Sequence, residues 1–242
     1  MSKEMQFDDV PIEQLPLVTV LICNYNYEEY LPHAINSALN QSYKKLGIVI
    51  VDDCSTDGSW DMMYKTYFKD IPHENGEEEH YKFKIGKING IGVFAIQLKQ
   101  NVGPSEARNV GIKLTISETQ AYQILDADDE MHPEKVKRLA ACMMQSSQIG
   151  VVYADTDIIN TETLNVTRMY REPFSIKRLQ QECIVHSGSL ISSEALRNVH
   201  DDFGFYDRNM RTCEDYDLWM RITERYLAAH IPESLTLVRV TG

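Results

Sequence analysis

The stretch Gly47–Asp57, GIVIVDDCSTD, decides the fold class of this 242-residue chain. Its β-branched run is typical of a strand that is buried on both faces of a sheet. Two acids end the run, and Ser55, Thr56 and Asp57 then supply capping residues for a helix. Apolar side chains follow at helical spacing, at Trp60, Met63, Tyr64 and Tyr67. A buried strand followed at once by a helix is the repeating unit of a parallel α/β sheet.

The same alternation continues on both sides of this stretch, up to Gly150. Short apolar runs predict three further strands, at Leu17–Cys23, Gly92–Lys99 and Ala121–Asp128. Apolar residues at helical spacing predict three further helices, at Glu28–Gln41, Pro104–Ser117 and Pro133–Gln145. The stretch Asp70–Gly90 is rich in Glu, Lys, His and Gly, and we expect a solvated loop or an insertion there.

The rhythm of the sequence changes after Gly150. Two strand-like stretches, 150–160 and 166–171, predict a hairpin, and helical patterns follow at Ser175–Glu182 and Glu214–Tyr226. No repeat, low-complexity segment or linker between independent domains is visible. We therefore expect one compact α/β domain, with a Rossmann-like mixed, mostly parallel sheet flanked by helices.

The composition argues against several classes of function. The 24 Lys and Arg residues against 36 Asp and Glu residues give a formal charge of −12, which disfavours nucleic-acid binding and a polybasic membrane anchor. The longest apolar run, Leu17–Cys23, is too short to span a bilayer, and the acidic start MSKEMQFDDV is unlike a signal peptide. Five widely spaced cysteines without a CxxC pair predict neither a disulfide framework nor a zinc site. We expect a cytoplasmic, globular protein.

Polar residues gather where the predicted strands end. Asn24, Asp52-Asp53 and Asp126–Asp129 each follow a strand, and parallel sheets bind ligands at that edge. Because side chains alternate along a strand, Asp126 and Asp128 would project from one face. Such a pair suits a hard divalent cation that also binds phosphate oxygens. Capping of the following turn is an equally good interpretation of these acids.

Three further groups of residues are candidates for binding or catalysis. Asp53 would accept a hydrogen bond from a nucleobase or ribose, although an acid after a strand ordinarily makes a turn. Arg108 lies in the first turns of a helix opened by Gly-Pro-Ser, either within reach of a phosphate or base or exposed to solvent. Glu214 and Asp215 begin a helix, where acids are usually caps and the alternative is a catalytic base. A second Asp-x-Asp, at Asp155–Asp157, is given no function.

Five motifs in this order resemble family 2 of the glycosyltransferases, whose fold is called GT-A. They are VTVLICNYN (18–26), IVIVDDCSTD (48–57), NVGPSEARNVGI (101–112), ILDADD (124–129) and CEDYDLW (213–219). The resemblance extends over residues 17 to 226, nearly the whole chain. It implies an inverting enzyme that moves a sugar from a nucleotide-diphosphate donor, most often a UDP-sugar, to an acceptor hydroxyl, with Mn²⁺ or Mg²⁺ as cofactor.

The resemblance also implies roles for residues on the donor side. Asp53 resembles the acid that reads the nucleobase, and Cys23 and Asn24 lie at the strand end that lines the same pocket. Arg108 resembles the arginine that approaches the base and the nucleotide. Asp126 would contact the ribose or the donor sugar.

On the metal and acceptor side, Asp128 would be the metal ligand, as the second acid of the Asp-x-Asp motif. Asp215 resembles the catalytic base, which takes the proton of the acceptor hydroxyl as that hydroxyl attacks. Its neighbour Glu214 is the alternative base. His186 lies in the half that holds the acceptor in relatives, where it either faces the acceptor or is a structural histidine.

The domain would then divide into an N-terminal arm (1–16), a donor-binding half (17–129) and an acceptor and catalytic-base half (130–242). The acceptor implied by the resemblance is a glycan or lipid-linked glycan of a bacterial-type surface polysaccharide. Such acceptors would bring the protein into peripheral contact with the inner face of a membrane.

Other classes fit the residues less well. A receiver module has its acid pair after the first strand, whereas Asp52-Asp53 follows the second. A DxDxT phosphatase needs Thr at position 130, which is Glu130, and a sugar nucleotidyltransferase needs a Gly-rich loop where Asn24–Tyr27 stands. The glycines of the chain do not have the spacing of a GxGxxG redox fingerprint. The remaining rival is a non-catalytic member of the same fold that binds a nucleotide or a partner.

Overall fold

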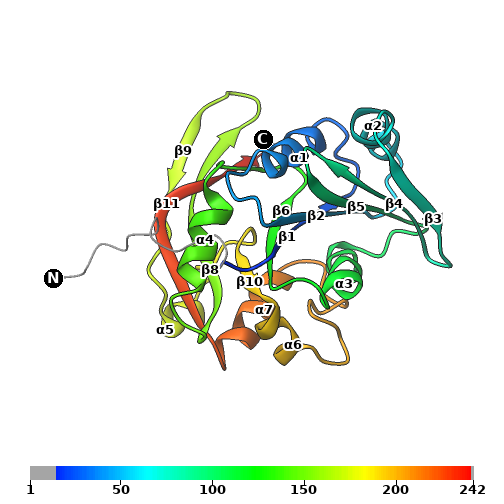
Figure 1. Cartoon of the computed structure of the whole chain (residues 1–242). Helices are drawn as coiled ribbons and strands as arrows, with labels where there is room; N and C mark the ends of the chain where they lie inside the picture. The colour runs from blue at the N-terminus through cyan, green and yellow to red at the C-terminus, as the bar shows by residue number, and fades with distance from the viewer. Residues whose placement is uncertain (1–14, 241–242) are drawn as a thin grey trace.

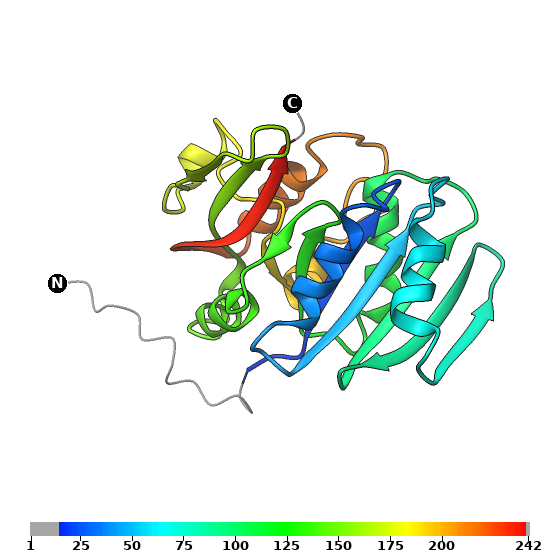
Figure 2. The ribbon, with the colours of Figure 1, turned by 90° about the horizontal axis from the view of Figure 1, so that it is seen from above.

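The computed structural model describes residues 15–240 and shows one mixed β-sheet with helices on both faces (Figures 1 and 2). Most of the predicted N-terminal arm, residues 1–14, lies outside the described residues. The strands are β1 (Val18–Asn24), β2 (Leu46–Asp52), β3 (His73–Glu77), β4 (Tyr81–Ile88), β5 (Ile91–Leu98), β6 (Ala121–Asp126), β7 (Glu130–Met131), β8 (Ile149–Asn160), β9 (Val166–Met169), β10 (Leu190–Ser192) and β11 (Leu227–Val240). The helical segments are α1 (Leu31–Leu39), α2 (Ser59–Met63) with its π-helical continuation η3 (Tyr64–Phe68), α3 (Pro104–Thr115), α4 (Lys135–Met143), α5 (Ile176–Leu179), α6 (Ser193–Val199) and α7 (Glu214–Thr223).

Four neighbouring parallel strands, in the order β5-β2-β1-β6, form the centre of the sheet. They are the four apolar runs that the sequence predicts. In their register Asn24 lies beside Asp52, and Cys23 lies beside Asp126. The polar residues that follow separate strands in the sequence are therefore brought to one edge of the sheet.

Antiparallel pairing extends this centre on both sides. Strands β4 and β3 continue the sheet beyond β5, and β10 and β8 continue it beyond β6. Strand β11 runs parallel to β8, while β9 and β7 pair antiparallel with β8 and β11. The predicted mixed α/β sheet is confirmed, and its parallel part consists of the central strands and the β8-β11 pair.

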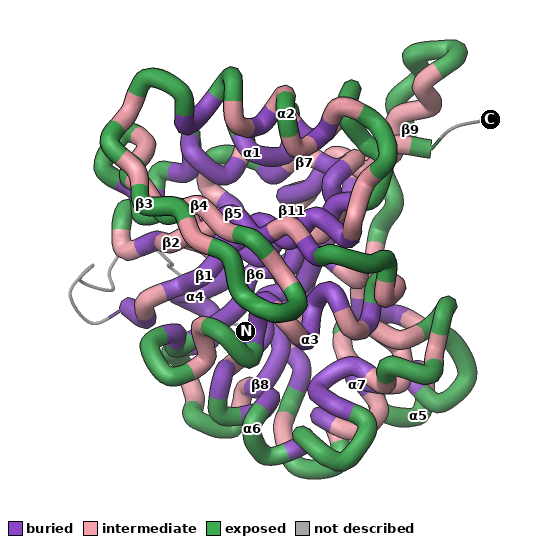
Figure 3. The backbone as a smooth tube through the Cα atoms, turned by 90° about the vertical axis from the view of Figure 1, so that its right-hand side faces the viewer, coloured by how far each residue is buried: buried purple, intermediate pink, exposed green. Residues whose placement is uncertain are grey.

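Successive side chains of the central strands fill two separate cores, and the buried positions follow these strands (Figure 3). Val20 and Ile22 pack with α1, α2 and α4 on one face, whereas Leu21 packs with α3, α6 and α7 on the other. At Gly111 of α3, a Cβ atom would lie 2.5 Å from Leu21 Cδ1 and 3.1 Å from Val51 Cγ2. Because Gly111 has no side chain, α3 packs closely against β1 and β2, beside the edge of the sheet that carries the polar residues.

The prediction of a solvated loop at Asp70–Gly90 is wrong, since this insertion contains the β3-β4 hairpin. Strand β4 pairs along its whole length with β5, and the Phe83 ring meets Phe94 of β5 edge to face, with centroids 5.9 Å apart. The alternation of Tyr81, Phe83 and Ile85 with lysines in β4 is the period-two pattern of a half-buried strand, and it was the available signal.

The second part of the chain follows the predicted order of elements. The hairpin expected after Gly150 is formed by β8 and β9, whereas the helix expected at Ser175–Glu182 is reduced to the four residues of α5. The last predicted helix forms as α7 and buries Leu218, Trp219 and Ile222. Within residues 15–240, no helix is long and apolar enough to cross a membrane.

Candidate active site

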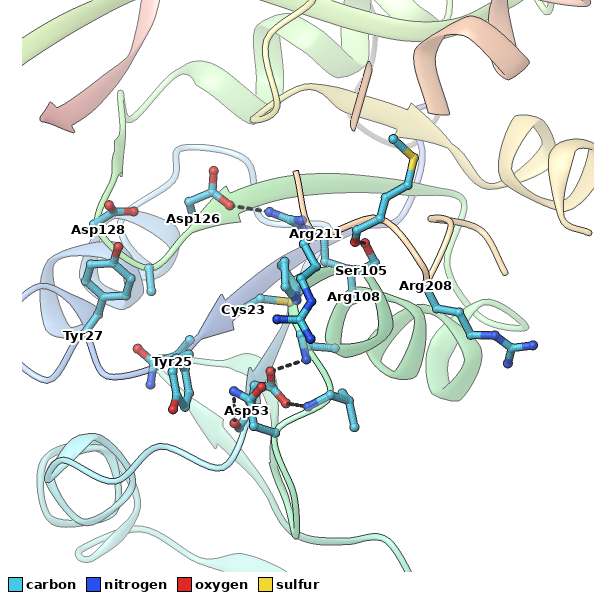
Figure 4. Close-up of a pocket in the computed structure, with 18 of the residues that line it drawn as sticks. Cys23, Tyr25, Tyr27, Asp53, Ser105, Arg108, Asp126, Asp128, Arg208 and Arg211 are labelled. Atoms are coloured by element: carbon cyan, nitrogen blue, oxygen red, sulfur yellow. Dashed lines mark hydrogen bonds and ion pairs between the residues drawn. The ribbon is translucent and has the colours of Figure 1, made fainter. Parts of the chain in front are cut away.

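A cavity of about 830 Å³ opens at the carboxyl edge of the central strands (Figure 4). The ends of β1 and β6, the start of α3 and the loop before α7 all contribute to it. Six of the nine site residues predicted from the sequence line it: Cys23, Asn24, Asp53, Arg108, Asp126 and Asp128. The other three, His186, Glu214 and Asp215, are not part of its lining but interact with residues that are.

Asp53 anchors the backbone segment that leads into α3. Its two carboxylate oxygens accept the backbone N–H groups of Val102 and Gly103, each at 2.8 Å. Gly103 has φ of 85°, a conformation that glycine adopts without strain. Burial raises the pKa of Asp53 and these two hydrogen bonds oppose that rise. The acid that was predicted to read a nucleobase is therefore also the anchor of the loop that forms this side of the cavity.

Asn24 is tied into the framework of the sheet. Its side-chain nitrogen donates to Asp52 Oδ1 at 2.8 Å and to Ser55 Oγ at 3.1 Å, and Gln97 of β5 donates to the same Asp52 carboxylate. These bonds join the ends of three strands. The preceding residue, Cys23, faces the cavity, and burial raises the pKa of its thiol to about 12, so the thiol is neutral.

Arg108 lies between two carboxylates instead of being exposed on its helix. One terminal nitrogen donates to Asp126 Oδ1 at 2.9 Å and the other to Glu214 Oε1 at 2.5 Å. The guanidinium also lies over the Tyr206 ring, 5.4 Å from its centroid. The residue is 7% exposed, so the structure resolves the alternative left open by the sequence in favour of a buried arginine.

Asp128 carries the less constrained carboxylate of the Asp-x-Asp motif. Both oxygens of Asp126 are engaged, by Arg108 and by the Ser187 hydroxyl at 3.3 Å. Asp128 lines the cavity, and the Tyr27 hydroxyl lies close to its carboxylate (Figure 4). Burial and the charge of Asp126 raise the pKa of Asp128, a shift that a bound cation would reverse.

The donor atoms around Asp128 suit a hard cation that takes most of its ligands from a substrate. Among residues 15–240, no group of three or more His, Cys, Asp or Glu side chains is placed to hold a metal ion. Mg²⁺ and Mn²⁺ sites commonly use one or two carboxylates and complete their oxygen ligands with water and substrate phosphates. Asp128 fits that arrangement, and it does not fit a closed structural metal site.

Glu214 and Asp215 begin α7 with different partners. Glu214 is paired with Arg108, and its side chain is 12% exposed. Asp215 accepts the adjacent Tyr216 N–H at 2.8 Å, and the charges of Arg108 and Asp126 act on it through space. Burial raises the pKa of Asp215, and the charge of Glu214 adds to this rise. A carboxylate with a raised pKa and no cation bonded to it is the better proton acceptor of the two.

His186 is a neutral histidine close to Asp126. Its Nδ1 atom accepts the N–H of Gly188 at 2.9 Å. Burial, together with the positive charges of Lys135 and Arg171, lowers the pKa of His186 to about 3. The side chain is therefore a dipole rather than a charge beside Asp126.

Sequence reasoning missed two arginines that line the cavity. Arg208 and Arg211 extend from the loop between α6 and α7 (Figure 4). They stand three positions apart, directly before the Glu-Asp pair, and this local basic spacing was the available signal. Positive charge at this place offsets the acidic residues of the cavity, which an anionic ligand requires.

Comparison with known proteins places the chain among glycosyltransferases. A model of the family described as "Glycosyl transferase family 2" matches residues 19–203. An uncharacterized glycosyltransferase from Nostoc sp. is 35% identical over 143 residues, which are 59% of this chain and 37% of the relative. An Escherichia coli enzyme named UDP-Glc:alpha-D-GlcNAc-diphosphoundecaprenol beta-1,3-glucosyltransferase WfaP is 25% identical over 89% of this chain and 73% of its own length.

Two solved structures share the fold. Staphylococcus aureus TarS 1–349 in complex with UDP-GlcNAc aligns with 92% of this chain and 58% of its own, with a TM-score of 0.66 and 20% identity. The mannosyltransferase PcManGT from Pyrobaculum calidifontis, in complex with GDP-Man and Mn²⁺, aligns with 95% of this chain and 59% of its own, with a TM-score of 0.64 and 15% identity. This chain thus spans less than two thirds of either solved chain.

The family match includes the segments that carry Asp53, Arg108, Asp126 and Asp128, and it ends before Glu214 and Asp215. The fold of the solved structures agrees with the sheet and helix layers described above. The match extends over well more than half of the sequence. The chain belongs to family 2 of the glycosyltransferases, as its sequence motifs predicted.

Proposed function

We propose that this chain transfers a sugar from a nucleoside-diphosphate donor, a UDP-sugar, to an acceptor hydroxyl with inversion at the anomeric carbon. The observation that carries the proposal is the pairing at the start of α7. Arg108 forms an ion pair with Glu214. Asp215 has no such partner and is available as a base near the cavity that Asp128 lines. An inverting transfer requires this separation, since the base and the leaving group act on opposite faces of the sugar.

The donor would occupy the cavity, with its base near Asp53 and Tyr25 and its diphosphate near Arg208, Arg211 and Asp128. The cavity, at about 830 Å³, is large enough for a nucleotide-sugar. The two solved relatives support this assignment, since their titles name UDP-GlcNAc and GDP-Man. In the proposed division of the domain, residues 17–129 supply most of these contacts, and residues 130–242 supply the acceptor site and the base.

A divalent cation, Mn²⁺ or Mg²⁺, would be held by Asp128 and the donor diphosphate. Bound there, it would offset the negative charge that grows on the leaving diphosphate. The PcManGT structure, whose title names Mn²⁺, supports a cation in this fold. The protein's own part would be to hold Asp128 at the cavity, where the Tyr27 hydroxyl lies beside its carboxylate.

On the other face of the sugar, Asp215 would take the proton of the acceptor hydroxyl as the oxygen attacks. A positioned base of this kind contributes about 10²–10⁴-fold to the rate. The acceptor we propose is a glycan or lipid-linked glycan of a surface polysaccharide, and WfaP supports it because its name includes a diphosphoundecaprenol-linked acceptor. With such an acceptor, the protein would work in the cytoplasm at the inner face of a membrane.

The alternative function is non-catalytic binding of a nucleotide or a partner by the same fold. The test compares the thermal unfolding of the purified protein with UDP, GDP, CMP and dTDP, each with Mn²⁺, Mg²⁺ or EDTA. A nucleotide at about 100 times its Kd adds roughly 2.7 kcal/mol to the free energy of unfolding. A metal-dependent rise in unfolding temperature with UDP, and with none of the other nucleotides, supports the proposed donor. The same rise with another nucleotide would correct the identity of the base. Stabilisation by UDP without sugar transfer in any acceptor screen would favour the non-catalytic alternative.

A further inference from the structure

A second cavity, of about 890 Å³, lies away from the nucleotide cavity, in the half of the chain after Gly150. It lies where the segment between β9 and α5 runs beside the start of β11 (Figures 1 and 2). Its lining includes the apolar side chains of Phe174, Leu227 and Pro232, the aromatic ring of Tyr170, and the polar side chains of Asp155, Arg171 and His230. We name it the Arg171 cavity.

The backbone at Arg171 is held by Asp155 of the second Asp-x-Asp motif, for which no function is predicted from the sequence. One oxygen of Asp155 accepts both the Arg171 N–H and His230 Nε2, each at 2.8 Å. The Asp155 and His230 side chains are 4% and 7% exposed, and the Tyr153 ring stacks on His230 with centroids 5.0 Å apart. This buried network holds the segment in place on β8 and β11. The position of Arg171 is thus determined by the core and not by a free loop.

The guanidinium of Arg171 has no partner among the residues that the structure describes. Its Nε atom is buried and makes no hydrogen bond, and burial lowers the pKa of the side chain. Two arginines nearby in the sequence differ in this respect, because Arg168 is paired with Asp157 and Arg178 with Glu172. Arginine keeps its charge in proteins, and its guanidinium pairs well with carboxylates and phosphates. The Asp155 carboxylate lies in the same cavity but accepts from the Arg171 backbone and from His230, so the Arg171 guanidinium is a candidate to bind an anion from outside.

Arg171 also connects this cavity with the proposed catalytic centre. Its charge acts on Asp215, and it contributes to the lowered pKa of His186. Phe174 of this cavity and Tyr216, which follows Asp215, pack against the same hydrophobic core. The Arg171 cavity therefore lies on the face of the sheet that carries α7 and Asp215.

We propose that the Arg171 cavity is an acceptor subsite that takes a glycan with an anionic group, a phosphate or a carboxylate, beside the sugar that receives the new bond. This inference rests on the proposed glycosyltransferase function, whose acceptor it specifies. Arg171 binds the anionic group, and the aromatic side chains of Phe174 and Tyr170 contact the C–H face of the sugar ring. Asp155 is a positioning residue, since it acts only by holding Arg171.

The test measures binding of three small glycosides that share one ring: methyl β-D-glucoside, methyl β-D-glucuronoside and methyl β-D-glucoside 6-phosphate. Ligand-observed NMR titrations are run with saturating UDP and diamagnetic Mg²⁺, so that the nucleotide cavity is filled. The variants are Arg171→Met, which removes the charge, and Arg171→Lys, which keeps it. Arg168→Met is the matched control, because Arg168 lies on the adjacent strand and is exposed and paired with Asp157. Inorganic phosphate alone is a further probe.

We expect the wild-type protein and the Arg168→Met variant to bind the charged glycosides about 10- to 100-fold more tightly than the neutral one, as a charge-assisted hydrogen bond implies. Arg171→Met should abolish this preference, and Arg171→Lys should retain part of it. The phosphate and carboxylate probes then tell which anion the site prefers. Binding of inorganic phosphate as tight as that of the phosphorylated glycoside would mean that the sugar is not recognised and would overturn the subsite.

Equal binding of charged and neutral glycosides by the wild-type protein would also overturn the proposal, and that comparison requires no variant to fold. So would a charge preference that survives in Arg171→Met. The outcome is separable from the donor assignment, because the stabilisation by UDP is measured on the same samples. If UDP does not bind but the Arg171-dependent preference for charged glycosides remains, the donor assignment is refuted and the subsite is supported.

Discussion

The guanidinium of Arg108 donates to the carboxylate of Glu214 at 2.5 Å and so joins α3 to the first residue of α7. The two residues are 106 positions apart in the sequence. Their contact assigns different chemistry to two adjacent acids. Glu214 becomes part of a buried ion-pair network with Arg108 and Asp126, while its neighbour Asp215 has no cation bonded to it.

Asp215→Asn should abolish most sugar transfer and leave UDP binding intact, because it removes the proton acceptor and keeps the shape of the side chain. The expected loss in kcat is about 10²–10⁴-fold. Asp217→Asn is the matched control on the same helix, since Asp217 pairs with Arg221 at 2.7 Å. Transfer assays with thermal-shift measurement of UDP binding separate the two effects. Near-normal transfer by Asp215→Asn would move the base to Glu214.

Asp128→Ala should lose the part of the UDP-induced stabilisation that requires Mn²⁺ or Mg²⁺. Asp128 lines the cavity, where it can bind a cation. Within residues 15–240, no group of three or more His, Cys, Asp or Glu side chains is placed to hold a metal ion. Asp157→Ala is the control, since Asp157 holds the same place in the second Asp-x-Asp and pairs with Arg168. At saturating UDP, wild type and control should unfold several degrees higher with metal than with EDTA. An unchanged metal effect in Asp128→Ala would exclude this residue as the ligand.

Arg108→Met should destabilise the fold by about 3–5 kcal/mol, since it leaves two largely buried carboxylates without their cation. Lys113→Met on the same helix removes an exposed bridge to Glu106 and should cost less than about 1 kcal/mol. Urea unfolding at neutral pH measures both. Arg108 lowers the folded-state pKa of Asp126, so this stabilisation is present above the ordinary aspartate range and is lost as the pH falls through the lowered pKa. Equal free energies of unfolding for the two variants would contradict the buried network.

The pH dependence of transfer should show the raised pKa of Asp215. A base must be deprotonated, so kcat/KM should rise with pH through a pKa above the ordinary range for aspartate. The same shift has the opposite sign for stability. A raised carboxyl pKa favours the fold below the unfolded-state pKa, and that contribution is lost as pH rises through the folded-state pKa. Asp215→Asn should therefore unfold at a higher temperature than wild type at neutral pH, and a lower one would count against the shift.

Gly111→Ala should destabilise the protein, although alanine favours helix formation in general. The new Cβ would lie 2.5 Å from Leu21 Cδ1, and such overpacking typically costs about 1–3 kcal/mol. Gly92→Ala is the control, because no atom lies within 4 Å of a Cβ there. Urea unfolding should separate the two variants by more than the error of the method. A stable Gly111→Ala protein would show that α3 is free to move away from the sheet.

Most strands and helices of the fold follow from local patterns in the sequence, and so does the edge of the sheet where the predicted site residues gather. Buried strands and amphipathic helices follow from local periodicity, so GIVIVDD and the other apolar runs could be read without contacts. Parallel strands have their carboxyl ends at one edge, so Asp53, Asp126 and Asp128 could be grouped in advance. The β3-β4 hairpin was missed although Tyr81, Phe83 and Ile85 alternate with lysines, because the polar composition of the surrounding stretch outweighed that short pattern.

The tertiary structure alone decided which charges are paired. Nothing in the local sequence distinguishes Glu214 from Asp215, or Arg171 from Arg168, and the distinction depends on whether a partner from a distant segment lies within hydrogen-bond distance. The same holds for Asp155, whose motif is identical in spacing to Asp126–Asp128 but whose carboxylate is buried against His230. Burial and pairing set the chemistry of an ionisable side chain, and both arise only when segments far apart in the chain pack together.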